Sequence, residues 1–252
     1  MLGFANTFSM TGRNVLFASW PVSVSELRPH IPPALEIDTY DGQAWVSALT
    51  IYVEQVRSSI IDIDAGIQFP QLNFRTYVSY KGKPGVYFLT LDTGEDLGAI
   101  LGRPTLGLPF FRSSIKMETN EEGVVDFKSR RTQPGVASAS FEVQYVPNGK
   151  QHTAESGSLE EFLIERHAYF VLDEGGPRAI LSKISGNNNR SGVKMGQIER
   201  EPWTLCEVSA EIRKNTLFRA LGLSDPKSTP HLRFSPLFTT TSRPLETVNS
   251  TK

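Results

Sequence analysis

The segment LNFRTYVSY (Leu72–Tyr80), KGKPG (Lys81–Gly85) and VYFLTL (Val86–Leu91) decides the fold that we expect for this chain. Its two outer runs are rich in β-branched and aromatic residues, which favour strands. The five residues between them include two glycines and a proline, which supply the backbone angles that a chain reversal needs. The segment therefore predicts a β-hairpin with its turn at 81–85.

Alternating strand and turn patterns continue on both sides of this hairpin. A strand is expected over 45–53, and a second hairpin over 111–119 and 124–131. Further strands are expected over 139–146, 168–172 and 205–212. Because many strands with few crossover helices are typical of antiparallel architectures, the sequence predicts a mainly-β (α+β) fold, as a barrel or a sandwich. No composition shift marks a linker, so we expect a single domain over residues 1–252.

Helices are expected to be few and short. Ser158-Leu159-Glu160-Glu161 fits a capping box and predicts a helix that ends near residue 166. Other short helices are expected over 25–30, 92–103 and 215–221, and a polar loop over 185–192. The chain from residue 230 onward is expected to be extended and interrupted by prolines. Arg130 and Arg131 end a strand and are interpreted as a solvated edge, with an anion clamp as the alternative.

Charge, cysteine and histidine content exclude several classes of protein. The 26 basic and 27 acidic residues nearly cancel, which leaves no net electrostatic footprint for nucleic acid. Cys206 is the only cysteine and the four histidines are scattered, so we expect neither a disulfide nor a metal site. No glycine-rich phosphate loop precedes a helix, and no cofactor is expected. Without a signal peptide or a bilayer-length apolar run, the chain is expected to be cytoplasmic with no membrane partner.

Three polar residues of the first hairpin are candidates for a binding site. Asn73, Arg75 and Tyr77 alternate along one strand, so their side chains point to the same face of the sheet. If that face lines a pocket, the guanidinium of Arg75 provides a forked clamp for a carboxylate or phosphate. The alternative is an exposed sheet face, on which an arginine and a tyrosine need no special role.

The end of the capped helix contributes a second group of candidates. Glu165 could act as a general base, or it could form a structural ion pair with Arg75, which is favoured because buried arginines usually have a carboxylate partner. Arg166 is placed with the substrate-binding residues. His167 could transfer protons, as histidine side chains often do, although a packing role is favoured at least equally.

Several phrases, in their order, resemble those of a known family. They are Phe17–Val22, Leu27–Glu36, Asp41–Val46, Phe69–Val78, Gly85–Asp92, Leu108–Phe111, Ser129–Arg131, Leu163–Arg166 and Glu201–Leu205. Together they resemble the YqjF-like family of uncharacterised bacterial proteins, whose fold is similar to that of acetoacetate decarboxylase. The resemblance spans roughly residues 17–248. It implies a bent antiparallel sheet that closes into a conical barrel around a small-molecule cavity, and it favours the pocket interpretation of the Arg75 face.

The resemblance also bears on the chemistry. Acetoacetate decarboxylase forms a Schiff base through a lysine that follows a Phe-Pro dipeptide. The matching place here is Leu108-Pro109, followed by Phe110 and Phe111, so aromatic rings replace the nucleophile. Phe110 is accordingly placed among the substrate-binding residues. Lys116 lies about 20 Å further along the same strand and cannot substitute.

We therefore expect a small organic metabolite with a carboxylate or carbonyl group, anchored by Arg75. Any reaction would be acid–base chemistry of the lyase, hydratase or isomerase type, with Tyr77 and Glu165 as catalytic residues and no Schiff base. One alternative is a non-catalytic ligand-binding or sensing module on the same scaffold. Another is an interaction protein whose edge strands pair into a homo-oligomer.

Overall fold

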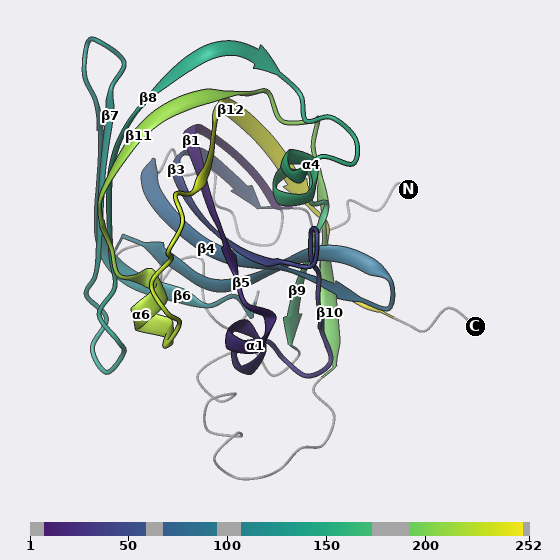
Figure 1. Ribbon diagram of the computed structural model, residues 1–252. Coiled ribbons are helices and arrows are strands. Elements are labelled where there is room, and N and C mark those ends of the chain that lie inside the picture. The colour runs from purple at the N-terminus through teal and green to yellow at the C-terminus, as the bar shows by residue number, and fades with distance from the viewer. Residues whose placement is uncertain (1–7, 59–67, 95–106, 173–191, 249–252) are drawn as a thin grey trace.

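The computed structural model describes residues 8–58, 68–94, 107–172 and 192–248 (Figure 1). The strands are β1 Phe8–Val22, β2 Glu36–Ile37, β3 Ala44–Ser58, β4 Phe69–Tyr80, β5 Lys83–Thr93, β6 Phe110–Thr119, β7 Val125–Arg131, β8 Ser140–His152, β9 Ala168–Leu172, β10 Val193–Glu199, β11 Leu205–Asn215, β12 His231–Ser242 and β13 Glu246–Thr247. The helices are α1 Val24–Leu27, the 3₁₀ turn η1 Arg28–His30, α4 Leu159–Ile164 and α6 Leu217–Leu221. The expected mainly-β fold with a few short helices is confirmed.

Both predicted hairpins are present. β4 and β5 pair antiparallel from Tyr80 opposite Lys83 onward, so the turn has two residues rather than the five that composition indicated. Those two residues, Lys81 and Gly82, have φ angles of 52° and 75°, the left-handed geometry of a tight hairpin turn. β6 and β7 form the second hairpin, with Thr119 opposite Val125.

The strands form one thirteen-stranded sheet with the order β13-β10-β9-β5-β6-β7-β8-β11-β12-β1-β3-β4-β2. Two additional pairings, β10 with β12 and β5 with β4, join strands that lie far apart in this order, so the sheet is strongly curled. β5 departs from the expected antiparallel arrangement, because it pairs parallel with both β6 and β9. Parallel neighbours need a long connection, and neither β6 nor β9 follows β5 through a tight turn.

Alternation along β4 separates two apolar clusters on opposite faces of the sheet. Phe74 and Val78 belong to one cluster, in which the Phe74 ring lies 5.4 Å from that of Phe218 in α6. Tyr77 belongs to the other cluster, which also contains Leu163 and Ile164 of α4. In Figure 1, α4 accordingly lies well away from α1 and α6, while β8 and β11 arch from the left of the view, where β7 lies, over the top toward α4.

Two long strands were not predicted. β1 and β12 pair along most of their length in the middle of the sheet order, yet residues 8–22 and 231–242 lack clean alternation. Pro236 within β12 made that segment look merely extended. The expected helix over 92–103 is wrong at its start, because Asp92 and Thr93 belong to β5. Gly94 is not helical either, and residues 95–103, with nearly all of the expected polar loop, lie outside the described residues.

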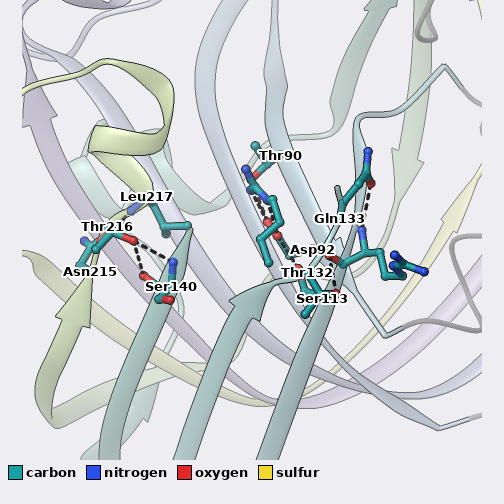
Figure 2. A network of polar contacts seen from close by, with 11 residues as sticks. Thr90, Asp92, Ser113, Thr132, Gln133, Ser140, Asn215, Thr216 and Leu217 are labelled. Atoms are coloured by element: carbon teal, nitrogen blue, oxygen red, sulfur yellow. Dashed lines mark hydrogen bonds and ion pairs between the residues drawn. The ribbon is translucent and has the colours of Figure 1, made fainter. Parts of the chain in front are cut away.

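Asp92 and Arg131 form a buried ion pair, which corrects the interpretation of Arg131 as a solvated edge residue. Arg131 donates through Nε and Nη2 to the two carboxylate oxygens, each at 2.8 Å. Ser113 and Thr90 donate to the same carboxylate at 2.7 and 3.1 Å (Figure 2). Asp92 is 1% exposed and Arg131 is 8% exposed. The three strands β5, β6 and β7 are therefore joined by an ion pair that is buried away from water. Arg130, whose side chain alternates to the other face, is exposed as expected.

A second polar network ties α6 to the sheet. The backbone N–H of Ser140 in β8 donates to Thr216 Oγ1 at 2.8 Å, and the Thr216 N–H donates back to the Ser140 carbonyl at 2.9 Å (Figure 2). Asn215 Oδ1 accepts from the Leu217 N–H at the start of the helix.

Among the described residues, no helix has the length and apolar character needed to cross a bilayer.

Candidate functional site

The six-residue helix α4 organises the candidate site, and its sequence explains why it starts where it does. Ser158 accepts a hydrogen bond from the Glu161 N–H at 3.2 Å, as the capping box predicts. The Glu161 carboxylate reaches back to the Gly157 N–H at 2.6 Å, one residue earlier than expected. Glu160 pairs with Arg233 of β12 and, at 3.1 Å, with His152 of β8. Glu160 therefore attaches the helix to both β12 and β8.

We expect His231, at the start of β12, to make this region sensitive to acid. Burial lowers the pKa of His231, nearby Arg233 lowers it further, and Glu160 opposes the shift. The unfolded chain therefore gains a proton near the ordinary histidine pKa of about 6.5, while the folded protein gains it only at lower pH. We expect the free energy of unfolding to fall as the pH drops through that range. The His231→Gln variant should show a smaller fall between pH 8 and pH 5.5 in urea unfolding; an equal fall would contradict the assignment.

The side chains of β4 converge on the last turn of α4. Arg75 Nη2 donates to the Leu163 carbonyl at 3.0 Å, and Tyr77 Oη donates to the same oxygen at 2.8 Å. Tyr77 Oη also lies 2.6 Å from Ser47 Oγ, which in turn lies 2.6 Å from Ser19 Oγ. All of these side chains are buried, so a chain of three hydroxyl groups ends beside the Arg75 guanidinium.

Arg75 lacks a counter-ion among the described residues. It is 9% exposed, and its Nε has no hydrogen-bond partner in the described part of the chain. Asn73, two residues earlier on the same face, has an equally unpartnered and buried Oδ1. The three residues that were predicted to share a face therefore do share it; all three are buried, and Arg75 and Tyr77 contact α4. A buried cation without an acidic partner is costly, and this local environment would favour an added anion.

Glu165 does not pair with Arg75, which corrects the expected ion pair. Its Oε2 accepts from Arg200 Nη1 at 2.7 Å, and its Oε1 accepts from the Trp203 N–H at 2.9 Å. Arg200 also donates to the Ile164 carbonyl at 3.0 Å, next to the carbonyl that Arg75 uses. Burial lowers the pKa of Arg200, Glu165 opposes this shift, and the positive charge of Arg75 adds to it. The two guanidinium groups are thus close enough to repel each other.

Arg200 was not among the site residues predicted from the sequence. An arginine between two glutamates is typical of a solvent-exposed segment, so the pattern provides no reason to select it. Arg200 reaches the end of α4 because β10, which precedes it, pairs with β9, the strand that follows α4. Its side chain is 4% exposed.

A second feature is an open cleft of about 750 Å³ beside α4. It is lined by Asp38, Tyr40, Lys83, Pro84, Gly157, Ser158, Glu161, Phe162, Glu165, Arg166, His167, Ala168, Met195 and Gln197. Arg166 Nη1 pairs with Asp38 at 2.7 Å, and its guanidinium stacks on Phe162 at 4.3 Å from the ring centre. The His167 side chain is 52% exposed and its Nε2 lies 3.8 Å from Glu165.

The predicted residues thus fall into two adjoining groups, which meet where the Tyr77 ring lies 5.1 Å from that of Phe162 and 5.4 Å from the Arg166 guanidinium. Asn73, Arg75 and Tyr77 are not in the lining of the cleft, and Phe110 belongs to the same apolar cluster as Tyr77. The remaining three, Glu165, Arg166 and His167, line the cleft. Lys116 is exposed and pairs with Glu118 at 2.8 Å, as the sequence indicated.

Solved structures similar to this one share its fold across nearly the whole chain. An acetoacetate decarboxylase-like enzyme from Sphingomonas wittichii RW1 has a TM-score of 0.61 at 12% identity, covering 96% of this chain and 92% of that protein. The enduracididine biosynthesis enzyme MppR, solved with pyruvate, has a TM-score of 0.59 at 13% identity, covering 98% and 92%. Acetoacetate decarboxylase from Legionella pneumophila has a TM-score of 0.58 at 14% identity, covering 97% and 88%. At these identities the likeness shows the fold alone.

Sequence comparison identifies the family. The uncharacterized protein YqjF of Bacillus subtilis (strain 168) is 37% identical over 226 residues, which cover 89% of this chain and 86% of YqjF. The model of the DUF2071 family, described as an uncharacterized conserved protein, matches residues 9–239. The resemblance inferred from the sequence phrases is confirmed, and the chain belongs to the DUF2071 family.

Proposed function

We propose that this protein binds a small organic metabolite through its carboxylate on the inner side of β4, with Arg75 as the anchor. The observation that carries the proposal is the buried Arg75 guanidinium, which has an unpartnered Nε and lacks an acidic partner among the described residues. An arginine fork suits a carboxylate because two parallel N–H donors match its two oxygens. The fold likeness to MppR, which was solved with pyruvate, supports a ligand of this class.

The neighbours of Arg75 define how such a ligand would be held. The Leu163 carbonyl accepts from Nη2 and, through Tyr77, is fixed to β4, so the guanidinium cannot swing freely. Asn73 lies beside it on the same face and would add a polar contact, because its Oδ1 is buried without a partner. The proposal includes the closed conical barrel predicted from the sequence, and the pairings of β10 with β12 and β5 with β4 support it.

The hydrogen bonds of Tyr77 and Glu165 favour a ligand-binding role for this site over catalysis by these two residues. The Tyr77 hydroxyl already donates to a backbone carbonyl, and both Glu165 oxygens accept hydrogen bonds. Neither group is poised to exchange a proton with a ligand unless α4 shifts. Imine chemistry lacks support as well, because no lysine is among the buried residues in the described ranges. Acid–base chemistry of the lyase, hydratase or isomerase type is retained as the alternative if α4 moves upon binding.

The test compares carboxylates with matched neutral molecules. Pyruvate and acetate should raise the melting temperature of the wild-type protein, while acetone and acetamide should not. Arg75→Met should weaken carboxylate binding by about 30-fold or more in isothermal titration, as expected when one member of a buried charge pair is lost. Arg130→Met, at an exposed arginine on β7, is the matched control and should bind like the wild type.

Two outcomes would contradict the proposal. One is unchanged pyruvate affinity in Arg75→Met, since the anchor would then lie elsewhere. The other is a covalent adduct after borohydride treatment with pyruvate, because this would restore the lysine route that the sequence and the buried residues argue against.

A further inference from the structure

The cleft beside α4 has the dimensions of a ligand site but is separate from the Arg75 face. Its volume of about 750 Å³ lies within the range of about 300–1,000 Å³ that small-molecule pockets occupy. Phe162, Pro84 and Met195 give it an apolar wall, and charged groups surround that wall.

Most of those charged groups are already satisfied by neighbours. Arg166 is paired with Asp38 at 2.7 Å and donates to the Phe162 carbonyl at 2.6 Å. Glu165 is paired with Arg200 at 2.7 Å. These residues shape the cleft, but their charges are neutralised within the protein.

Two opposite charges remain in the lining. Within the described part of the chain, Lys83 and Glu161 each lack an ion-pair partner. Glu161 uses Oε2 to accept from the Gly157 N–H, which leaves Oε1 for another donor. Lys83 is exposed at the first position of β5. The cleft therefore carries one uncompensated anion and one uncompensated cation.

These charges lie at opposite ends of the cleft. Glu161 is in the first turn of α4, next to Ser158 and Gly157. The parallel pairing of Val86 with Tyr169 carries the start of β5 alongside the residues that follow α4, so Lys83 lies near Arg166 and His167. Glu161 is five residues before Arg166, which corresponds to about 7 Å at the helical rise of about 1.5 Å per residue, and we take this as the approximate span between the two ends.

We propose that this cleft binds a short zwitterion of dipeptide size, independently of the Arg75 site. The ammonium group of the ligand would lie toward Glu161 and its carboxylate toward Lys83, with His167 and Gln197 at the same end. Two extended residues span about 7 Å, which is comparable with this span. An apolar side chain of the ligand would pack on Phe162 and Met195.

The experiment uses alanylphenylalanine, its N-acetyl derivative and its C-terminal amide, titrated by calorimetry into the full-length protein. The free dipeptide is expected to bind about fivefold to tenfold more tightly than either blocked form, since each block removes one partly exposed charge pair. Equal affinity for the three molecules, or an absence of binding by all of them, would overturn the proposal.

Two variants test the orientation of the ligand. Lys83→Met should bind the dipeptide and its amide equally, yet still discriminate against the N-acetyl form. Glu161→Gln, which keeps the hydrogen bond to Gly157, should show the reverse pattern. Lys150→Met, at an exposed lysine outside the cleft, is the matched control and should resemble the wild type.

The Arg75→Met variant separates this proposal from the proposed function. Its affinity for the dipeptide should equal that of the wild type even where pyruvate binding is lost. A parallel loss of dipeptide binding would show that both ligands use one site, and the separate cleft site would be rejected.

Discussion

Replacing Arg131 with methionine is expected to lower the free energy of unfolding by about 3–5 kcal/mol, the usual result of removing one member of a buried ion pair. The Asp92 carboxylate, 1% exposed, would remain in the interior with only the hydroxyl groups of Thr90 and Ser113 as donors. Urea unfolding at neutral pH measures the change. Arg130→Met provides the control, and should stay within about 0.5 kcal/mol of the wild type because its side chain is exposed.

A double variant keeps this prediction testable if the single one fails to fold. Asp92→Leu combined with Arg131→Met removes both charges and fills the space with apolar atoms, so it should be more stable than either single variant. If the two single losses simply added in the double variant, the ion pair would not be the source of the effect.

Replacing Glu165 with alanine should cost about 2–4 kcal/mol, because it leaves Arg200 buried next to a second cation, Arg75. The substitution also removes the acceptor of the Trp203 N–H. Glu165→Gln can keep that acceptor and loses only the charge, so the difference between the two variants separates the hydrogen bond from the ion pair.

A bound carboxylate should partly offset the loss in Glu165→Ala. An anion at Arg75 reduces the repulsion between the two guanidinium groups, so pyruvate should raise the melting temperature of this variant by more than that of the wild type. An equal or smaller rise would indicate that Arg75 and Arg200 do not share an electrostatic environment.

Local patterns predicted those parts of the structure that local contacts stabilise. The β4–β5 hairpin needs only its strand residues and the Lys81-Gly82 turn, and α4 needs the Ser158 cap. The pattern failed for β1 and β12, whose pairing joins the two ends of the chain. A strand whose two faces are both buried need not alternate, and β1 has an uninterrupted buried run over residues 15–20, so its sequence resembles any apolar segment.

The candidate site divides in the same way. That Asn73, Arg75 and Tyr77 share a face follows from the two-residue period of a strand, and the sequence alone determined it. Which carboxylate pairs with which arginine was decided only by tertiary structure, because Glu165 is 35 residues from Arg200 and the Asp92–Arg131 pair is separated by 39. Long-range ion pairs depend on strand order and on the burial of each partner, and neither is encoded in the spacing of residues along one strand.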